Sequence, residues 1–168
     1  MRARNPDFNV TIEKVYDDSI SSISVEPQDL SRVFLNLINN AFDAVDAKFG
    51  SKGGDSEIPL NPPSKGEITP IFPLEEDPGG MSPTVKVSTK KHPNQIEIRI
   101  RDNGTGIPED IRKQIFNPFF TTKPTGQGNT GLGLSISFDI ITKVHRGELK
   151  VETEIGKFTE FIIRIPKS

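Results

Sequence analysis

The stretch Gly126-Gln-Gly-Asn-Thr-Gly-Leu-Gly-Leu-Ser135 places four glycines within eight residues and leads directly into an apolar run that extends to Val144. Glycine tolerates positive φ and lets a ligand approach the bare backbone. A glycine-rich turn that opens a helix also offers unpaired N–H groups at the positive end of the helix dipole. These properties favour a site for the phosphates of a nucleotide, although a flexible loop before a surface helix has the same composition.

The bulk composition is that of one globular domain. The chain has 168 residues, of which 33% are hydrophobic and 26% charged, and its formal net charge is −2. Without a long basic run, nothing indicates nucleic acid or direct contact with a membrane surface. The absence of cysteine excludes disulfides, thiolate metal sites and a cysteine nucleophile. No apolar run has the length of a membrane span or of a signal peptide, and we expect a segment of a longer protein.

A long amphipathic helix is predicted from about residue 27 to 48. Pro27 suits its first turn, and apolar residues from Leu30 to Val45 follow the helical period. Asn36, Asn40 and Asp43 form a separate polar stripe. Because asparagine is a poor helix former, the presence of both Asn36 and Asn40 in this helix calls for an explanation. A solvent-facing stripe is one interpretation, and contact with a metal or ligand is the other.

The order of elements predicts an α+β fold with one mixed sheet and helices on one face. We expect strands at about 8–16, 21–25, 84–91, 95–101, 149–154 and 158–165, and helices at about 27–48, 108–116 and 132–144. Alternation of Phe8, Val10 and Ile12 indicates that the first strand is half-buried. In the strand at 95–101 we expect Ile96, Ile98 and Ile100 to face inward and Glu97, Arg99 and Arg101 outward, and the last two strands are expected to pair as a closing hairpin around Ile155-Gly156-Lys157. Residues 50–83 carry half of the 14 prolines and are expected to form an exposed insertion with little regular structure.

A further motif, Asp102-Asn-Gly-Thr-Gly106, ends an apolar strand. A carboxylate there could accept a hydrogen bond from an exocyclic amine, while Gly104 and Gly106 would let a flat ring approach the chain. Taken alone, the motif favours an Asx turn that closes the strand.

Four motifs in order resemble the four boxes of the ATP-binding catalytic domain of sensor histidine kinases. They are Asn36-Leu-Ile-Asn-Asn40-Ala41, Asp102-Asn-Gly-Thr-Gly106, Phe116-Asn-Pro-Phe-Phe120 and Gly128-Asn-Thr-Gly-Leu-Gly-Leu134. The resemblance covers about residues 8–166 apart from the insertion, so that residues 1–168 form one such domain. It implies the Bergerat (GHKL) fold, a two-layer α/β sandwich with a mixed, mostly antiparallel sheet and about three helices on one face.

The resemblance also implies roles for individual residues. Asn40 would hold Mg²⁺ through its amide oxygen, and Asn36 would support the metal–phosphate cluster, with Asp43 in the same polar stripe. The other expected contacts with the nucleotide or its lid are Asp102 at the adenine amino group, Gly104, Gly106 and Ile107 at the base, Phe116, Phe119 and Phe120 as anchors of the lid, Thr121, Thr122 and Lys123 after them, and Gly128, Thr130, Gly131, Leu132, Gly133 and Leu134 near the phosphates. Lys123 is equally read as a solvated lysine.

The implied activity is transfer of the γ-phosphoryl group of Mg-ATP to a histidine on a separate dimerisation domain, with a response regulator downstream. ATP-hydrolysing relatives such as gyrase and MutL carry Glu where this chain has Asn36. Since an amide cannot act as a general base, slow ATPase activity is expected. Neither His92 nor His145 has the sequence context of the phosphorylated histidine, so the phosphoacceptor domain is absent from these residues. A cytoplasmic location is expected, and the resemblance leaves open whether the parent protein is anchored in a membrane.

Two alternatives remain at this point. A regulatory nucleotide-binding module without transfer activity would have the same boxes, whereas a serine-directed kinase of the anti-sigma type is disfavoured by Asn36.

The sequence also departs from the family pattern at two places. Asn129 is an extra residue before the Thr-Gly-Leu-Gly run, and Arg146 stands where the family often has glycine, so a different turn is expected at 145–147.

Overall fold

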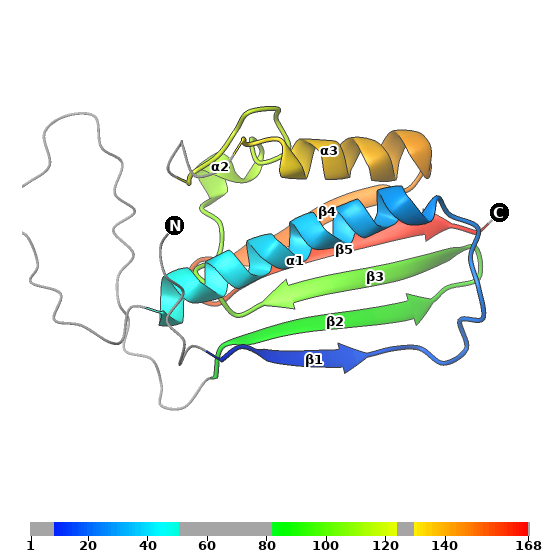
Figure 1. Ribbon diagram of the computed structural model, residues 1–168, viewed down its shortest axis with the longest axis horizontal. Coiled ribbons are helices and arrows are strands. Elements are labelled where there is room, and N and C mark those ends of the chain that lie inside the picture. Colours follow the sequence, from blue (N-terminus) through cyan, green and yellow to red (C-terminus); the bar gives the residue numbers. More distant parts are fainter. Residues whose placement is uncertain (1–8, 51–81, 124–129, 168) are drawn as a thin grey trace, which may run out of the picture.

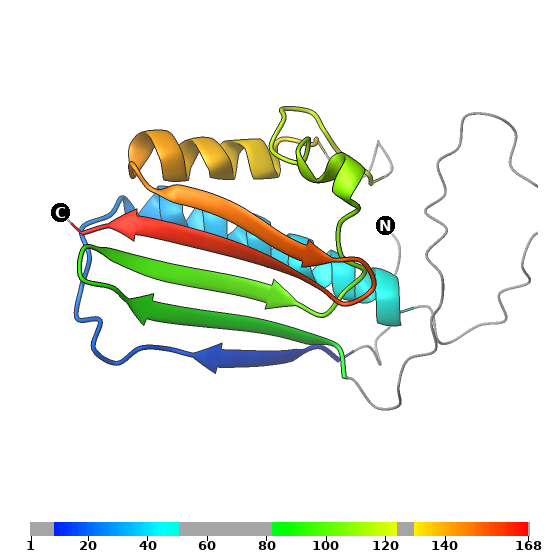
Figure 2. The same cartoon turned by 180° about the vertical axis from the view of Figure 1, so that it is seen from behind.

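The computed structural model describes residues 9–50, 82–123 and 130–167, which form one sheet and a layer of helices on one of its faces (Figures 1 and 2). The elements in chain order are β1 (Thr11–Val15), α1 (Pro27–Phe49), β2 (Thr84–Lys91), β3 (Gln95–Asp102), α2 (Glu109–Arg112), α3 (Gly133–Asp139), the π-helix η1 (Ile140–Val144), β4 (Glu148–Glu154) and β5 (Phe158–Pro166). The insertion expected at 50–83 lies almost wholly outside the described residues.

The sheet is mixed and has the strand order β1-β2-β3-β5-β4. Strand β1 pairs with β2 in parallel, and the other three pairings are antiparallel. The predicted α+β class, with one mixed sheet that is mostly antiparallel, is therefore confirmed. The expected closing hairpin is also present, because β4 and β5 pair around Ile155 to Lys157.

The core lies between α1 and the sheet. Helix α1 begins at Pro27, and it buries one face because its apolar residues recur at helical spacing. The residues it buries are Leu30, Val33, Leu37, Ala41 and Val45. Strand β3 contributes Ile96, Ile98 and Ile100 to the same cluster, as its alternation predicts.

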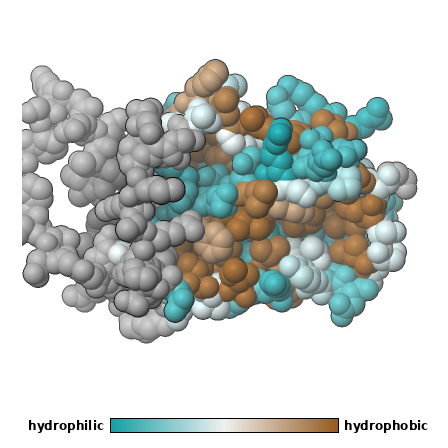
Figure 3. Space-filling view, in the orientation of Figure 1, coloured by the Kyte–Doolittle hydropathy of each residue, from teal (hydrophilic) through white to brown (hydrophobic). Residues whose placement is uncertain are grey.

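Strand β1 differs from the expectation of a half-buried strand, since all five of its residues are exposed. Ile12 pairs with the buried Val85 and so lies on the helical face, yet it is 52% exposed. The reason is that none of the helices in the described residues lies in front of this edge of the sheet, and Figure 3 shows hydrophobic residues at the surface there. Of the other two residues of the alternation, Val10, just before β1, is partly buried and packs against the core, and Phe8 lies outside the described residues.

The strand expected at 21–25 is wrong, because the structure has no regular element between β1 and α1. This segment leads from the sheet to the helix layer, and Ile23 and Val25 pack against the core without strand pairing.

The helix expected at 108–116 is a single turn, α2. The helix expected at 132–144 is α3 followed by η1. At the end of η1, Arg146 takes φ 52°, the left-handed conformation that glycine favours, so the turn at 145–147 keeps that conformation without glycine.

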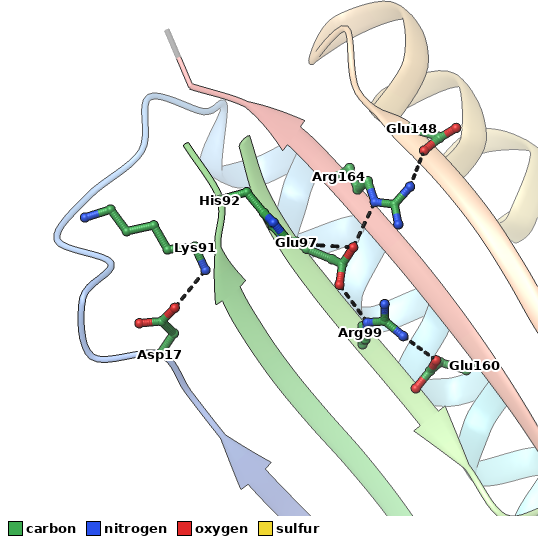
Figure 4. Close-up of polar contacts among 8 residues, drawn as sticks. All are labelled: Asp17, Lys91, His92, Glu97, Arg99, Glu148, Glu160 and Arg164. Carbon is green, nitrogen blue, oxygen red and sulfur yellow. Dashed lines mark hydrogen bonds and ion pairs between the residues drawn. The ribbon is translucent and has the colours of Figure 1, made fainter. Parts of the chain in front are cut away.

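The face of the sheet opposite the helices carries a chain of ion pairs across β3, β5 and β4 (Figure 4). Glu97 accepts hydrogen bonds from Arg99 at 2.7 Å and Arg164 at 2.8 Å, and these arginines also pair with Glu160 and Glu148. Glu97 points outward as its alternation predicts, yet it is only 4% exposed. Long arginine side chains therefore cover part of this face, which none of the described helices covers.

Candidate functional site

Helix α1 contacts three other parts of the chain at successive turns, and the first contact is made by Asn36. The amide nitrogen Nδ2 of Asn36 donates to the backbone oxygen of Gly133 at 3.1 Å and to Ser137 Oγ at 3.2 Å. Both acceptors belong to α3. This contact joins α1 to the end of the glycine-rich stretch, 97 residues further along the chain.

One turn further along α1, Asn40 and Asp43 hold the side chain of Lys123. The ammonium group of Lys123 donates to Asn40 Oδ1 at 3.1 Å and to Asp43 Oδ2 at 2.6 Å. A cation therefore lies on one amide oxygen and one carboxylate oxygen, which are ligand types that Mg²⁺ also takes. The backbone N–H of Lys123 donates to Thr121 Oγ1 at 3.1 Å, while Thr122 is exposed.

The third contact brings the loop after β3 against α1 at Ala44. A Cβ added to Gly104 would lie 2.6 Å from the carbonyl carbon of Ala44, so only glycine fits this approach. Asp102 immediately precedes this loop and is 3% exposed. The Asp102 carboxylate accepts a hydrogen bond from the backbone N–H of Gly104 at 2.9 Å, as an Asx turn does. The turn interpretation therefore holds, and it is compatible with a ligand role because a carboxylate has several lone pairs.

Burial dominates the electrostatics of Asp102. Removal from water raises the pKa of its carboxyl group to about 6, against the lowering effect of hydrogen bonds from the backbones of Gly104 and Thr159. A carboxyl group with a shifted pKa beside bare glycine backbone is a marker of a binding site.

Gly106 and Ile107 continue this loop toward the β4–β5 hairpin. Gly106 has φ 72°, and a Cβ there would lie 2.4 Å from the backbone oxygen of Glu154. The N–H of Ile107 donates to Thr153 Oγ1 at 2.8 Å. Lys48 at the end of α1 donates to the backbone oxygens of Asn103 and Gly156 and thereby joins both loops to the helix.

The phenylalanines of the third motif have different environments. Phe116 packs against Phe138 of α3 with ring centroids 5.1 Å apart, and Phe120 also packs on the core. Phe119, expected as a third anchor, is instead 74% exposed and has φ 66°. Its backbone is in close contact with Gly131, where a Cβ would lie 2.6 Å from the carbonyl carbon of Phe119. Unlike Phe116 and Phe120, Phe119 therefore does not pack on the core, and its expected role at the lid stays a prediction.

The late glycine-rich residues lie at the start of α3. Gly131 has φ 66°, Leu132 precedes the helix, and Gly133 is its first residue. Leu134 packs against the core, and Thr130 is exposed. Gly128 and Asn129 lie outside the described residues.

Two buried polar residues at this site were missed by the sequence reasoning. Ser137 is fully buried and touches Asn36. Thr159 is 3% exposed and pairs with Asp102 across β3 and β5. Ser137 falls one helical turn after Gly133, which is a weak signal, and the position of Thr159 depends on a strand register that the sequence does not reveal.

The described part of the chain contains no group of three or more His, Cys, Asp or Glu side chains that could enclose a metal ion. An ion on Asn40 would therefore take its further ligands from water or a bound phosphate. A surface depression over the first turns of α1 reaches Asn36, but its lining lies on one helix and does not include Asp102. The arrangement along α1 defines the candidate site better than this depression does.

Comparison with known proteins identifies the family of this chain. The family model described as histidine kinase-, DNA gyrase B- and HSP90-like ATPase matches residues 25–168. Sporulation kinase E of Bacillus subtilis is 34% identical over 158 residues, which is 94% of this chain and 16% of the kinase. The sensory histidine kinase/phosphatase NtrB of Rhizobium leguminosarum is 31% identical over 160 residues, which is 95% of this chain and 36% of that protein.

The solved catalytic domain of the histidine kinase ThkA has a similar fold. Its TM-score is 0.66 at 24% identity, with 95% of this chain and 82% of that chain covered. The chain belongs to the histidine kinase-, DNA gyrase B- and HSP90-like ATPase family. Within that family it is homologous to the catalytic domains of sensor histidine kinases, and it spans well under half the length of the curated relatives named above.

Proposed function

We propose that this chain binds Mg-ATP along α1 and transfers the γ-phosphoryl group to a histidine on a separate dimerisation domain. One observation supports this proposal above the others. Within nine residues of α1, about 12 Å of helix, Asn36 contacts the start of α3, Asn40 contacts Lys123, and Ala44 contacts the Asp102 loop. Motifs far apart in sequence therefore meet along a single helix.

At one end of this row, Asp102 would bind the base. Its carboxylate would accept a hydrogen bond from the adenine amino group, and Gly104 and Gly106 leave the backbone bare for a flat ring. Burial strengthens such a hydrogen bond because little water competes for it. Ile107 would contribute apolar contact with the base, since it is partly buried at the edge of the core.

At the other end, the amide oxygens of α1 would face the triphosphate. Asn40 would hold the metal through Oδ1, with Asn36 and Asp43 beside it. When bound, Mg²⁺ would offset the negative charge of the phosphates. The observed contact with Lys123 supports this assignment, because an ammonium group already lies on the Asn40 and Asp43 oxygens. We expect Lys123 to release Asn40 when the metal binds and then to contact the phosphates as a point charge.

The protein residues would therefore act by binding and orientation. Backbone N–H groups at Gly131 to Leu134 would orient the phosphates, and the Phe116 and Phe120 side chains would hold the adjoining loop against the core. Positioning and charge neutralisation account for phosphoryl transfer without a protein base. A response regulator would receive the group next; ThkA has been crystallised with one, which is a property of that protein.

Nucleotide titration tests the binding proposal. We expect Asp102→Ala to weaken ATP binding about 10- to 100-fold with and without Mg²⁺, because it removes a hydrogen bond to the base from a buried site. We expect Asn40→Ala to abolish the difference between the affinities measured with and without Mg²⁺. Asn94→Ala, in the β2–β3 turn, and Asp139→Ala, on an exposed side chain of α3, are matched controls and should bind like wild type. Wild-type affinity in both site variants would contradict the proposed site.

Addition of the cognate histidine-bearing domain and γ-labelled ATP tests transfer. Acid-labile phosphohistidine on that domain is expected. ATP binding without labelled histidine would instead favour a regulatory nucleotide-binding module, and acid-stable phosphoserine on a partner would favour a serine-directed kinase.

A further inference from the structure

Ser137 has a buried hydroxyl group between α3 and α1, and none of the four motifs includes it. The residue is 0% exposed. Its Oγ donates to the backbone oxygen of Gly133 at 2.8 Å and accepts from Asn36 Nδ2 at 3.2 Å. Asn36 Nδ2 also donates to the same Gly133 oxygen at 3.1 Å. The three groups therefore form a closed triangle that links the two helices.

The chemistry of this triangle determines which end of the Asn36 amide faces α3. A backbone carbonyl oxygen can only accept, so both groups that approach the Gly133 oxygen must be donors. The hydroxyl proton of Ser137 is used in this way, which leaves the Ser137 oxygen as an acceptor. Both acceptors then face the NH₂ group of Asn36, and the amide oxygen is turned away from them.

This orientation matters for a site that binds a metal and phosphates. An amide presents either an acceptor oxygen or two donors, and a half-turn of its terminal torsion exchanges them. Gly133 alone offers Asn36 one acceptor, whereas Ser137 supplies a second acceptor within hydrogen-bond distance of the same nitrogen. The hydroxyl group also satisfies the Gly133 carbonyl at the first turn of α3.

We propose that Ser137 is a positioning residue that holds the Asn36 amide with its oxygen toward the metal–triphosphate site. This inference rests on the proposed function of that site. Ser137 would not touch the nucleotide. It would act through Asn36 and would affect the metal-dependent part of nucleotide affinity, not adenine recognition.

Ser135 provides a matched control on the same helix. It is also buried, at 8% exposed, and its Oγ donates to the backbone oxygen of Leu132 at 3.0 Å. Ser135→Ala and Ser137→Ala therefore each remove one hydroxyl group that donates to a carbonyl of the preceding turn. Only Ser137→Ala also removes an acceptor from Asn36.

The affinity measurement compares these variants with and without Mg²⁺. We expect Ser137→Ala to reduce the Mg²⁺-dependent gain in ATP affinity about 3- to 10-fold, the range expected for one hydrogen bond. The affinity without Mg²⁺ should stay within about twofold of wild type, and Ser135→Ala should change neither value. If the alanine variant does not fold, Ser137→Cys replaces it with the same expectation, because a thiol is a weak acceptor of similar size.

A double-mutant cycle tests whether the effect passes through Asn36. Ser137→Ala should have no further effect on the Mg²⁺-dependent gain in an Asn36→Ala background. An equal effect in both backgrounds would overturn the inference, as would behaviour identical to Ser135→Ala.

A readout without nucleotide separates this inference from the proposed function. The side-chain NH₂ resonances of Asn36, measured by ¹⁵N NMR, should shift and exchange faster with water in Ser137→Ala but not in Ser135→Ala. Unchanged resonances would refute the contact itself. Failure of the wild type to bind ATP would instead overturn the proposed function, and the proposed role of Ser137 with it, even where the NMR shows the contact.

Discussion

At the residue scale, Asp102 shows how a binding group reduces stability. Its carboxyl has a pKa of about 6 in the folded chain against an ordinary value of 3.8, chiefly because it is buried. Between these pH values the folded state binds more protons than the unfolded state, so the free energy of unfolding falls as pH rises through this window. The shift corresponds to about 3 kcal/mol at neutral pH, and solvent screens little of it because the side chain is almost fully buried.

The substitution Asp102→Asn tests this cost. Since asparagine does not titrate, the stability of the variant relative to wild type should increase by about 2–3 kcal/mol between pH 4 and pH 7. Urea denaturation at several pH values measures this change, and parallel profiles for the two proteins would contradict it.

Asp17→Asn is a control of opposite sign. Hydrogen bonds from Ser19 and from the backbone of Lys91 (Figure 4) lower the pKa of Asp17 to about 2. Its contribution to stability is therefore present above pH 3.8 and is lost as pH falls toward 2. The free energy of unfolding of Asp17→Asn should therefore lie below that of wild type at neutral pH, and the difference should shrink only at acid pH.

At the element scale, the two faces of the sheet are covered differently. Helices pack on one face, and ion-paired side chains cover part of the opposite face. Burial raises the pKa of Glu97, but hydrogen bonds from Arg99 and Arg164 outweigh this and lower it overall. Ile162, which pairs with Arg99 in the strand register, is only 1% exposed although it faces away from the helices. Glu97 therefore holds two arginine side chains over an apolar residue of β5.

We expect Glu97→Gln to destabilise the fold by about 1–3 kcal/mol. It leaves two guanidinium groups without their shared carboxylate, and the loss is moderated because both are about one-third exposed. Glu13→Gln is the matched control, since Glu13 and Lys86 form an exposed pair at 3.6 Å and should contribute less than about 0.5 kcal/mol. Denaturant midpoints measure the stability of both variants. An equal loss of stability in both would refute the structural role of the buried Glu97 carboxylate.

At the scale of the whole molecule, α1 organises both the core and the site. Its apolar face packs on the sheet, while Asn36, Asn40 and Ala44 contact α3, Lys123 and the Asp102 loop. Within the described residues no helix has both the length and the apolar character needed to cross a membrane. Nucleotide binding between these parts would join segments about 100 residues apart.

This organisation predicts slow ATP hydrolysis by the chain alone. The Asn36 amide cannot take a proton from water, and its N–H groups already bind α3. Since general-base catalysis contributes about 10²–10⁴-fold, turnover should be at least about 100-fold below the typical enzymatic 10 s⁻¹. Phosphate release under saturating Mg-ATP measures this rate, and Asn40→Ala identifies any contaminating ATPase, which it would leave unchanged. Rapid turnover that is lost in Asn40→Ala would contradict the prediction.

Much of the fold was predictable because its signals are local. The period of α1, the alternation of β3 and the hairpin of β4 and β5 depend on residues a few positions apart, and all three are confirmed. The expected half-burial of β1 was wrong because alternation shows only that a strand has two different faces. Which face is covered depends on where the helices lie.

The amino-acid sequence by itself determined the α+β class, the order of the four motifs and hence the family, because periodicity and motif spacing are properties of the chain alone. Only the tertiary structure decided that Ser137 binds Asn36, that Thr159 lies opposite Asp102 and that Glu97 is buried beneath arginines. Ser137 and Asn36 are 101 positions apart, and Thr159 and Asp102 are 57 positions apart. The burial of Glu97 depends on arginines from its own strand and from a neighbouring one. Strand register and layer packing bring them together, and no local pattern encodes either.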